Sequence, residues 1–187
     1  MSKIAVIGGG SFGTVVANII ALNGHDVQFW MRSSELVDEV NEYHENKQYL
    51  PGYSLNKKVV ATESMADAVT KSSLIFVAVP SSSFREVVKQ IVVFAPEDAM
   101  LISTTKGIEP GSFKLMSQVL DEESPNSRIG VLSGPNLAKE IASKHPTGTV
   151  IASNIEEIRE TVKDVLRSDT FRVYTNDDMF GIELGGS

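Results

Sequence analysis

A regular alternation of short apolar runs with segments of helical periodicity is the feature that most narrows the possible folds. The run 3–7 has the length and apolar content of a strand, and 74–79 is apolar at every position, as expected when both faces of a strand are covered. Between such runs, apolar residues recur at helical spacing, for example along 155–167. This alternation predicts an α/β fold, in which a mainly parallel sheet has helices on both faces.

The predicted elements follow one another without an obvious linker or internal repeat. Strands are expected at 3–7, 27–31, 58–62, 74–79, 100–104, 128–132, 149–153 and 171–175, and helices at 11–23, 34–41, 64–71, 83–95, 112–120, 136–143 and 155–167. The polar and aromatic segment 42–55 contains Pro51 and Gly52, so it is predicted to be a loop. The strands after Pro146 are expected to extend the same sheet, so that residues 1–187 form one domain. The chain is expected to stop within a new element that starts near Asn176.

Composition excludes several classes of protein. The chain has 187 residues, of which 42% are hydrophobic and 22% charged, which argues against a disordered or membrane-spanning chain. Its net charge of -7 argues against a nucleic-acid binder. There is no cysteine, and no spacing of His, Asp and Glu is typical of a metal site. The N-terminus lacks the pattern of a signal peptide, so a cytoplasmic location is expected.

A glycine-rich turn joins the first strand to the first helix. Gly8, Gly10 and Gly13 match the pattern G-x-G-x-x-G, which in this strand–turn–helix context is typical of Rossmann-type, doubly wound domains that bind dinucleotides. In such a turn the first glycine permits the tight bend, the second lets a diphosphate approach the backbone, and the third lets the helix pack against the strand. The alternative is a glycine-rich turn with no ligand.

The end of the second predicted strand indicates which dinucleotide would bind. NAD sites usually place an acidic residue about 20 positions beyond the glycines, but here Arg32 lies 19 residues after Gly13 and is followed by Ser33. An arginine there can pair with the 2′-phosphate of NADP. The sequence therefore predicts that NADPH or NADP is preferred and that NADH or NAD is second. The alternative is an exposed arginine paired with Glu35.

Several motifs in the same order resemble the bacterial NAD(P)-dependent glycerol-3-phosphate dehydrogenases. After the glycine turn, which continues as Ser11-Phe12-Gly13-Thr14, the matching segments are Tyr49-Leu50-Pro51-Gly52, Ala78-Val79-Pro80-Ser81, Thr105-Lys106-Gly107-Ile108, Ser133-Gly134-Pro135-Asn136-Leu137-Ala138-Lys139-Glu140 and Glu183-Leu184-Gly185-Gly186. Together they span the whole chain, and they cover only the N-terminal, nucleotide-binding half of the family. Phe12 stands where the family often has Trp, another large ring.

The resemblance implies hydride transfer between a nicotinamide cofactor and a three-carbon phosphate, in which dihydroxyacetone phosphate and sn-glycerol 3-phosphate are interconverted for glycerophospholipid synthesis. The implied cofactor contacts are Ser11, Phe12, Arg32, Ser33, Tyr49, Lys106 and Ala138, and the implied substrate contacts are Lys106, Gly134 and Asn136. The family's acid–base lysine would follow Ser187, and its helical substrate domain would come later still. The 187-residue chain is therefore expected to bind cofactor without turnover, and a homodimer would form through the missing half.

The residues themselves leave some of these roles open. Lys106 follows a predicted strand at the edge where parallel sheets bind ligands, so its cation could stabilise a developing alkoxide; the alternative is a surface lysine in a glycine turn. Asn136 could cap the helix that follows it or offer its amide to a substrate. At the level of the whole chain, the alternatives are an NADP-binding sensor or regulatory module, and another dehydrogenase such as a 6-phosphogluconate-type or 2-hydroxyacid enzyme.

Overall fold

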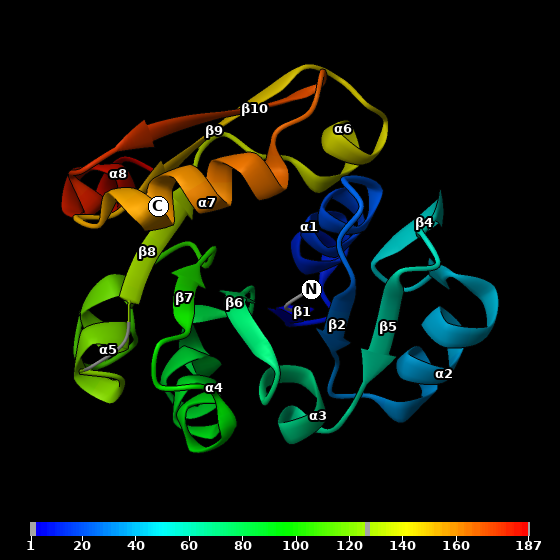
Figure 1. Cartoon of the computed structure of the whole chain (residues 1–187), viewed down its shortest axis with the longest axis horizontal. Coiled ribbons are helices and arrows are strands. Elements are labelled where there is room, and N and C mark those ends of the chain that lie inside the picture. Colours follow the sequence, from blue (N-terminus) through cyan, green and yellow to red (C-terminus); the bar gives the residue numbers. More distant parts are fainter. Residues whose placement is uncertain (1–2, 126–127, 187) are drawn as a thin grey trace.

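A computed structural model describes residues 3–125 and 128–186 of the chain and contains an eight-stranded sheet (Figure 1). The sheet strands are β1 (Lys3–Ile7), β2 (Val27–Trp30), β5 (Val59–Thr62), β6 (Ser72–Val77), β7 (Met100–Ser103), β8 (Arg128–Ser133), β9 (Thr147–Ala152) and β10 (Phe171–Asn176). The helices are α1 (Ser11–Leu22), α2 (Ser34–Tyr43), α3 (Met65–Val69), α4 (Ser81–Phe94), α5 (Met116–Glu123), α6 (Ala138–Ala142), α7 (Glu156–Leu166) and α8 (Met179–Gly185).

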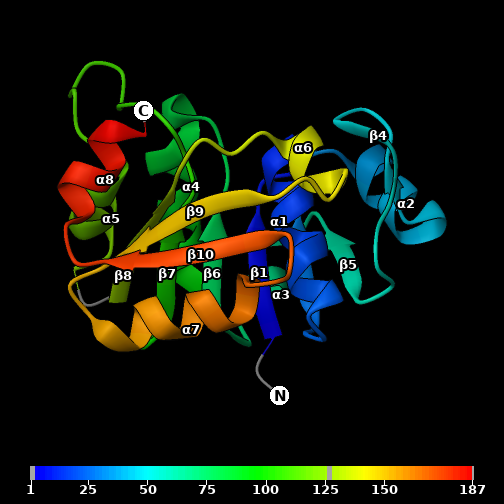
Figure 2. The ribbon, with the colours of Figure 1, turned by 90° about the horizontal axis from the view of Figure 1, so that it is seen from above.

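The strand order confirms the predicted Rossmann-type topology. Neighbours in the sheet run β10-β9-β8-β7-β6-β1-β2-β5, and the six strands from β5 to β8 have the doubly wound order, with β1 and β6 adjacent where the direction of winding reverses. The described strand pairs of this sheet are parallel except β8 with β9. Figure 2 shows β9 and β10 side by side with α7 alongside β10, so the last strands extend the sheet as predicted.

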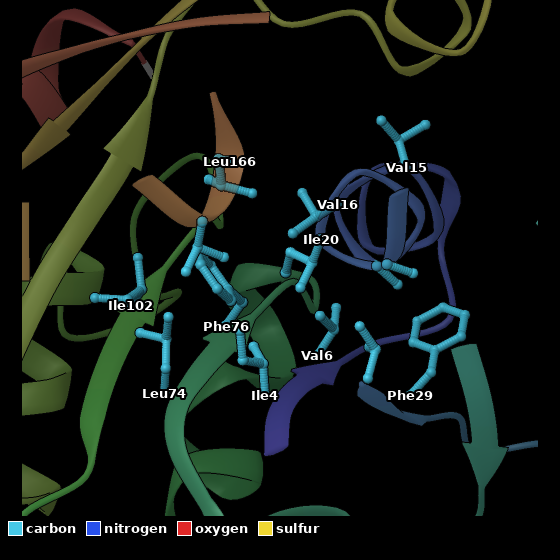
Figure 3. Close-up of a cluster of buried hydrophobic side chains, with 14 of the residues drawn as sticks. Ile4, Val6, Val15, Val16, Ile20, Phe29, Leu74, Phe76, Ile102 and Leu166 are labelled. Carbon is cyan, nitrogen blue, oxygen red and sulfur yellow. The ribbon is translucent and has the colours of Figure 1, made fainter. Parts of the chain in front are cut away.

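Helices cover both faces of the sheet because its central strands are apolar on both sides. Along β1, Ile4 and Val6 face a core that includes α1 and α7, whereas Ala5 and Ile7 face a second core with α3, α4 and α5. This alternation follows the two-residue period of a strand. Figure 3 shows Val16 and Ile20 of α1, with Leu166 of α7, above Val6 and Phe76. In the parts of the chain that are described, no helix has both the length and the apolar character needed to cross a membrane.

The prediction that 42–55 is a loop is wrong. Helix α2 continues to Tyr43, and the residues after it form a two-stranded ribbon of β3 (Glu45–Asn46) and β4 (Leu50–Ser54). The ribbon does not show the usual alternation of apolar and polar residues, because it is anchored by two buried side chains, Asn46 and Leu50. Because one of the two buried residues is the polar Asn46, the sequence of the ribbon lacks the alternating hydrophobic pattern that predicts a strand.

One predicted helix start is confirmed, and two others move. The cap of α2 is Ser33, whose hydroxyl accepts from Leu36 N, so α2 starts at the predicted residue. Helix α5 starts at Met116 rather than at 112, because the preceding residues form a turn with Phe113 at a positive φ of 59°. The expected new element is α8, and its cap is Asp178.

Candidate functional site

A continuous groove follows the carboxyl ends of the strands on both sides of β1 and β6. Its first cavity, of about 300 Å³, is lined by the glycine turn, the end of β2 and Tyr49. The second, of about 350 Å³, contains Phe12, Lys106 and Asn136 and shares Ala78, Val79 and Pro80 with the first. The third, of about 470 Å³, shares Lys106, Ser133 and Gly134 with the second and reaches α8. The groove lies at the switch point of the sheet, where open α/β sheets bind ligands.

All but one of the predicted site residues line this groove. The first cavity brings together Gly8, Gly10, Arg32, Ser33 and Tyr49. The second contains Ser11, Phe12, Lys106, Gly134, Asn136 and Ala138. Gly13 lies beneath the turn, where it contacts Gly8 rather than the groove. These residues are far apart in the sequence, and the sheet brings them together because its parallel strands end at one edge.

The three motif glycines occupy different environments. Gly8 has a φ of +124°, and a Cβ there would lie 2.3 Å from the carbonyl oxygen of Ala78. A Cβ on Gly13 would lie 2.0 Å from the carbonyl oxygen of Gly8. Both positions therefore exclude any side chain. At Gly10 a Cβ would meet nothing within 4 Å, so the backbone there borders open space at the start of α1, where the first N–H groups of a helix have no intrahelical acceptor.

The end of β2 places an exposed cation beside the first cavity. Arg32 is exposed and lines that cavity. Glu35 is engaged elsewhere, since Ser33 Oγ donates to Glu35 Oε2 at 2.5 Å and lowers the pKa of that carboxyl. Within 3–125 and 128–186, no Arg32–Glu35 ion pair is found. Arg32 is therefore exposed beside the groove, and Glu35, its partner in the alternative, bonds to Ser33 instead.

Lys106 and Gly134, 28 residues apart in sequence, are brought together in the second and third cavities. Lys106 Nζ donates to the Gly134 carbonyl oxygen at 3.0 Å. The segment before it is held against β6, because Thr104 Oγ1 donates to Val77 O at 3.0 Å and Thr105 Oγ1 to Val79 O at 2.7 Å. Lys106 is thus an exposed cation on an anchored backbone at the carboxyl edge of the sheet.

Of the two roles left open for Asn136, the structure does not show the helix cap. Helix α6 starts at Ala138 with Leu137 at its N-cap. Asn136 Nδ2 instead donates to Thr149 Oγ1 at 2.9 Å, which ties the loop to β9. Its Oδ1 is buried, with no hydrogen-bond partner in the described part of the chain. An unpaired buried oxygen is costly, and this one belongs to a residue that lines the second cavity.

Two polar residues important for the site were missed by the sequence reasoning. Asn46 is fully buried and bonds to the glycine turn through Gly9 O at 2.9 Å. Glu183, in α8, is 3% exposed and accepts from Ser117 N at 3.1 Å and from Ser117 Oγ at 2.5 Å. Burial raises the pKa of Glu183. Glu183 begins one of the motifs that carry the family resemblance, and Asn46 lies three residues before the motif that starts at Tyr49. Neither motif indicates that the residue is buried or which group it bonds to.

A charged cluster anchors the segment that follows Lys106. Arg85 of α4 holds both oxygens of Glu109, at 2.7 and 2.8 Å, and also pairs with Glu122 and Glu123 of α5. The guanidinium lowers the pKa of Glu109 to about 2. A two-point pair of this kind fixes direction as well as distance, so Arg85 orients the turn three residues beyond Lys106. No group of His, Asp and Glu suited to a metal ion is found over 3–125 and 128–186.

Comparisons with known proteins agree with this geometry. Residues 3–159 match the family model described as NAD-dependent glycerol-3-phosphate dehydrogenase N-terminus. Glycerol-3-phosphate dehydrogenase [NAD(P)+] of Alcanivorax borkumensis is 51% identical over 183 residues, which cover 98% of this chain and 53% of the relative. The same enzyme of Teredinibacter turnerae is 49% identical over 185 residues, or 99% of this chain and 54% of the relative.

A solved structure shows the same relation. The crystal structure of glycerol-3-phosphate dehydrogenase from Coxiella burnetii superposes with a TM-score of 0.94 at 34% identity, and covers 99% of this chain and 57% of that one. The chain thus spans about half the length of the curated relatives and of the solved structure that it matches.

Proposed function

Because the chain belongs to the family of NAD-dependent glycerol-3-phosphate dehydrogenase N-termini, we propose that it is the cofactor-binding half of a glycerol-3-phosphate dehydrogenase. The whole enzyme would interconvert dihydroxyacetone phosphate and sn-glycerol 3-phosphate for glycerophospholipid synthesis. The observation that carries this proposal is the continuous groove, which joins the glycine turn to Lys106 along the carboxyl ends of the strands. Its three connected cavities suit an extended dinucleotide with a small substrate at one end.

The residues present fit a dinucleotide. The open backbone at Gly10 and the start of α1 suit its diphosphate, and Arg32 with Tyr49 suits the adenosine end. When bound, the nicotinamide supplies the hydride that reduces the ketone carbon. Phe12 and Ala138 line the second cavity, where the ring would be held. Lys106, Gly134 and Asn136 would then contact the substrate beyond it.

Lys106 is proposed to act on the substrate oxygen. In the reducing direction the ketone oxygen gains negative charge as hydride arrives at its carbon, and a cation held nearby stabilises that charge. Lys106 can exchange its bond with Gly134 O for this oxygen, because its ammonium is exposed. The proton that completes the alcohol is proposed to come from a lysine of the family that lies beyond Ser187. The helical substrate domain is assigned to the same later region, as is any dimer interface.

NADP is proposed as the preferred cofactor because of Arg32. One charge-assisted hydrogen bond contributes about 1.5–3 kcal/mol, so a guanidinium on the 2′-phosphate favours NADPH over NADH by roughly 10- to 100-fold. Ser33 is proposed to assist by turning its hydroxyl from Glu35 to the same phosphate. A cytoplasmic location stays a prediction from the sequence.

Titration of the purified chain with NADPH and NADH tests the proposal. We expect NADPH to bind more tightly and Arg32→Ala to lower its affinity about 10- to 100-fold while NADH binding changes less than about 3-fold. Arg172→Ala, an exposed arginine on edge strand β10, serves as the control and should change neither. Equal losses of affinity for both cofactors would show that Arg32 does not contact the 2′-phosphate.

Turnover of dihydroxyacetone phosphate distinguishes the half-enzyme from the alternatives. The 187-residue chain is expected to bind NADPH and to show negligible turnover. Turnover near ordinary enzyme rates would contradict the assignment of the acid–base lysine to a later region. Absence of any nucleotide binding would overturn the proposal as a whole.

A further inference from the structure

Both polar atoms of the Asn46 side chain are hydrogen-bonded, and its Nδ2 links the β3–β4 ribbon to the glycine turn. Its Nδ2 donates to Gly9 O at 2.9 Å and to Thr14 Oγ1 at 2.8 Å, and its Oδ1 accepts from Tyr49 N at 3.3 Å. The side chain is fully buried. A buried amide with all its bonds made has a single orientation, because each alternative would leave a polar atom unpaired.

Thr14 extends this arrangement by one residue. Its hydroxyl accepts from Asn46 and donates to Gly10 O at 2.8 Å, and its backbone N–H also donates to Gly10 O at 2.9 Å. Thr14 is itself fully buried. Two consecutive carbonyls of the turn, those of Gly9 and Gly10, are therefore held on the inner side of the backbone.

The orientation of those carbonyls determines where the neighbouring N–H groups point. The C=O and N–H of a trans peptide point in opposite directions, and the described part of the chain has no cis peptide. With Gly9 O and Gly10 O directed at Asn46 and Thr14, the N–H groups of Gly10 and Ser11 are directed to the opposite side. Successive N–H groups that converge in this way form an anion-binding concavity, and the backbone at Gly10 borders open space.

We propose that Asn46 is a positioning residue for the diphosphate of the dinucleotide, acting through the peptide units of Gly9 and Gly10. The inference rests on the proposed function, because it states how the proposed cofactor is recognised. It makes the β3–β4 ribbon part of the nucleotide site. Ser11 Oγ supports the same contact, since it donates to Tyr49 O at 2.6 Å.

Asn41 provides a matched control in the same region. Its side chain bonds to both backbone groups of Ala61, with Nδ2 donating to the carbonyl at 3.0 Å and Oδ1 accepting from the N–H at 2.8 Å. It fastens α2 to β5 and does not contact the glycine turn. Asn41→Ala removes two side-chain hydrogen bonds to the backbone without touching the glycine turn, and it therefore controls for the loss of such bonds.

The test compares two ligands that differ in the diphosphate. NADPH contains the diphosphate, whereas 2′-AMP has the same adenosine 2′-phosphate but no diphosphate. For Asn46→Ala and for Asn46→Asp, which keeps the acceptor and loses both donors, we expect NADPH affinity to fall at least 10-fold and 2′-AMP affinity to change less than about 2-fold. Asn41→Ala should change both by less than about 2-fold. Calorimetry gives the affinities, and circular dichroism confirms that each variant is folded.

Thr14 variants keep the inference testable if the Asn46 variants do not fold. Thr14→Val, which loses the hydroxyl, is expected to weaken NADPH binding about 3- to 10-fold, and Thr14→Ser, which retains it, should bind as the original chain does. If the original chain fails to bind NADPH, the proposed function fails. If it binds and the Asn46 and Thr14→Val variants bind equally well, or lose NADPH and 2′-AMP alike, the role of Asn46 is overturned.

Discussion

The two ends of the groove are built in different ways. At the glycine turn the surface is main chain, fitted so closely that a Cβ on Gly8 or Gly13 would overlap a carbonyl oxygen. Around Lys106 the surface is formed by side chains, of which Lys106 bonds to Gly134 O and Asn136 to Thr149, and Asn136 Oδ1 has no partner among the described residues. The first end is complete before a ligand arrives. At the second end, hydrogen bonds made within the protein would be exchanged for bonds to a ligand.

The sharpest test of this contrast is at the glycines. Gly13→Ala is expected to lower the free energy of unfolding by about 2–4 kcal/mol, since the new methyl would press on Gly8 O and packed backbone cannot give way cheaply. Gly10→Ala should change stability by less than about 1 kcal/mol, because its Cβ meets open space and its φ of -73° suits alanine. Urea denaturation measures both.

The same pair separates stability from binding. Gly10→Ala should weaken NADPH binding although it leaves the fold intact, because its methyl occupies the space assigned to the diphosphate. A stable Gly13→Ala variant would mean that the turn is less tightly built than its contacts indicate. A Gly10→Ala variant that binds NADPH normally would contradict the placement of the diphosphate beside Gly10.

At the other end, Glu183 is expected to give the next largest effect. Glu183→Ala leaves the N–H and hydroxyl of Ser117 without their acceptor, which costs about 1–3 kcal/mol of unfolding free energy. Exposed Glu160, replaced by Ala as the control, should cost less than about 0.5 kcal/mol. Urea denaturation compares the two variants, and equal values for both would show that Glu183 does not hold α8 against α5.

Two carboxylates are expected to change the stability of the chain in opposite directions as the pH rises. Burial raises the pKa of Glu183 above 4.5, so its contribution is largest below that value and is lost as the pH rises through the raised pKa. Arg85 lowers the pKa of Glu109 from 4.5 to about 2, so that contribution is present above pH 4.5 and is lost as the pH falls toward 2. Thermal melts across this pH range should show that Glu183→Gln lacks the fall in melting temperature with rising pH, and that Glu109→Gln lacks the fall with decreasing pH. A melting profile identical to that of the original chain would contradict the corresponding pKa shift.

The smallest effect is expected at Asn136. Asn136→Ala breaks one hydrogen bond to Thr149 but also removes a buried oxygen that has no partner, so the two changes offset each other to within about 1 kcal/mol. NADPH affinity should stay within about 2-fold, unlike that of Asn46→Ala. Calorimetry and denaturation check both values. A large loss of NADPH affinity would show that Asn136 contacts the cofactor, which contradicts its assignment to the substrate.

The sequence alone determined the alternation of strands and helices, the glycine turn and the position of Arg32, because these depend on periodicity and on spacing within one strand–helix unit. Most predicted site residues reached the groove for the same reason, since parallel strands end at a common edge. The tertiary structure decided the roles of Asn46, Asn136 and Glu183, together with the ribbon that the sequence presents as a loop. Each of these polar groups is defined by a partner in a distant segment, and the burial that makes the contact matter exists only once the chain has folded.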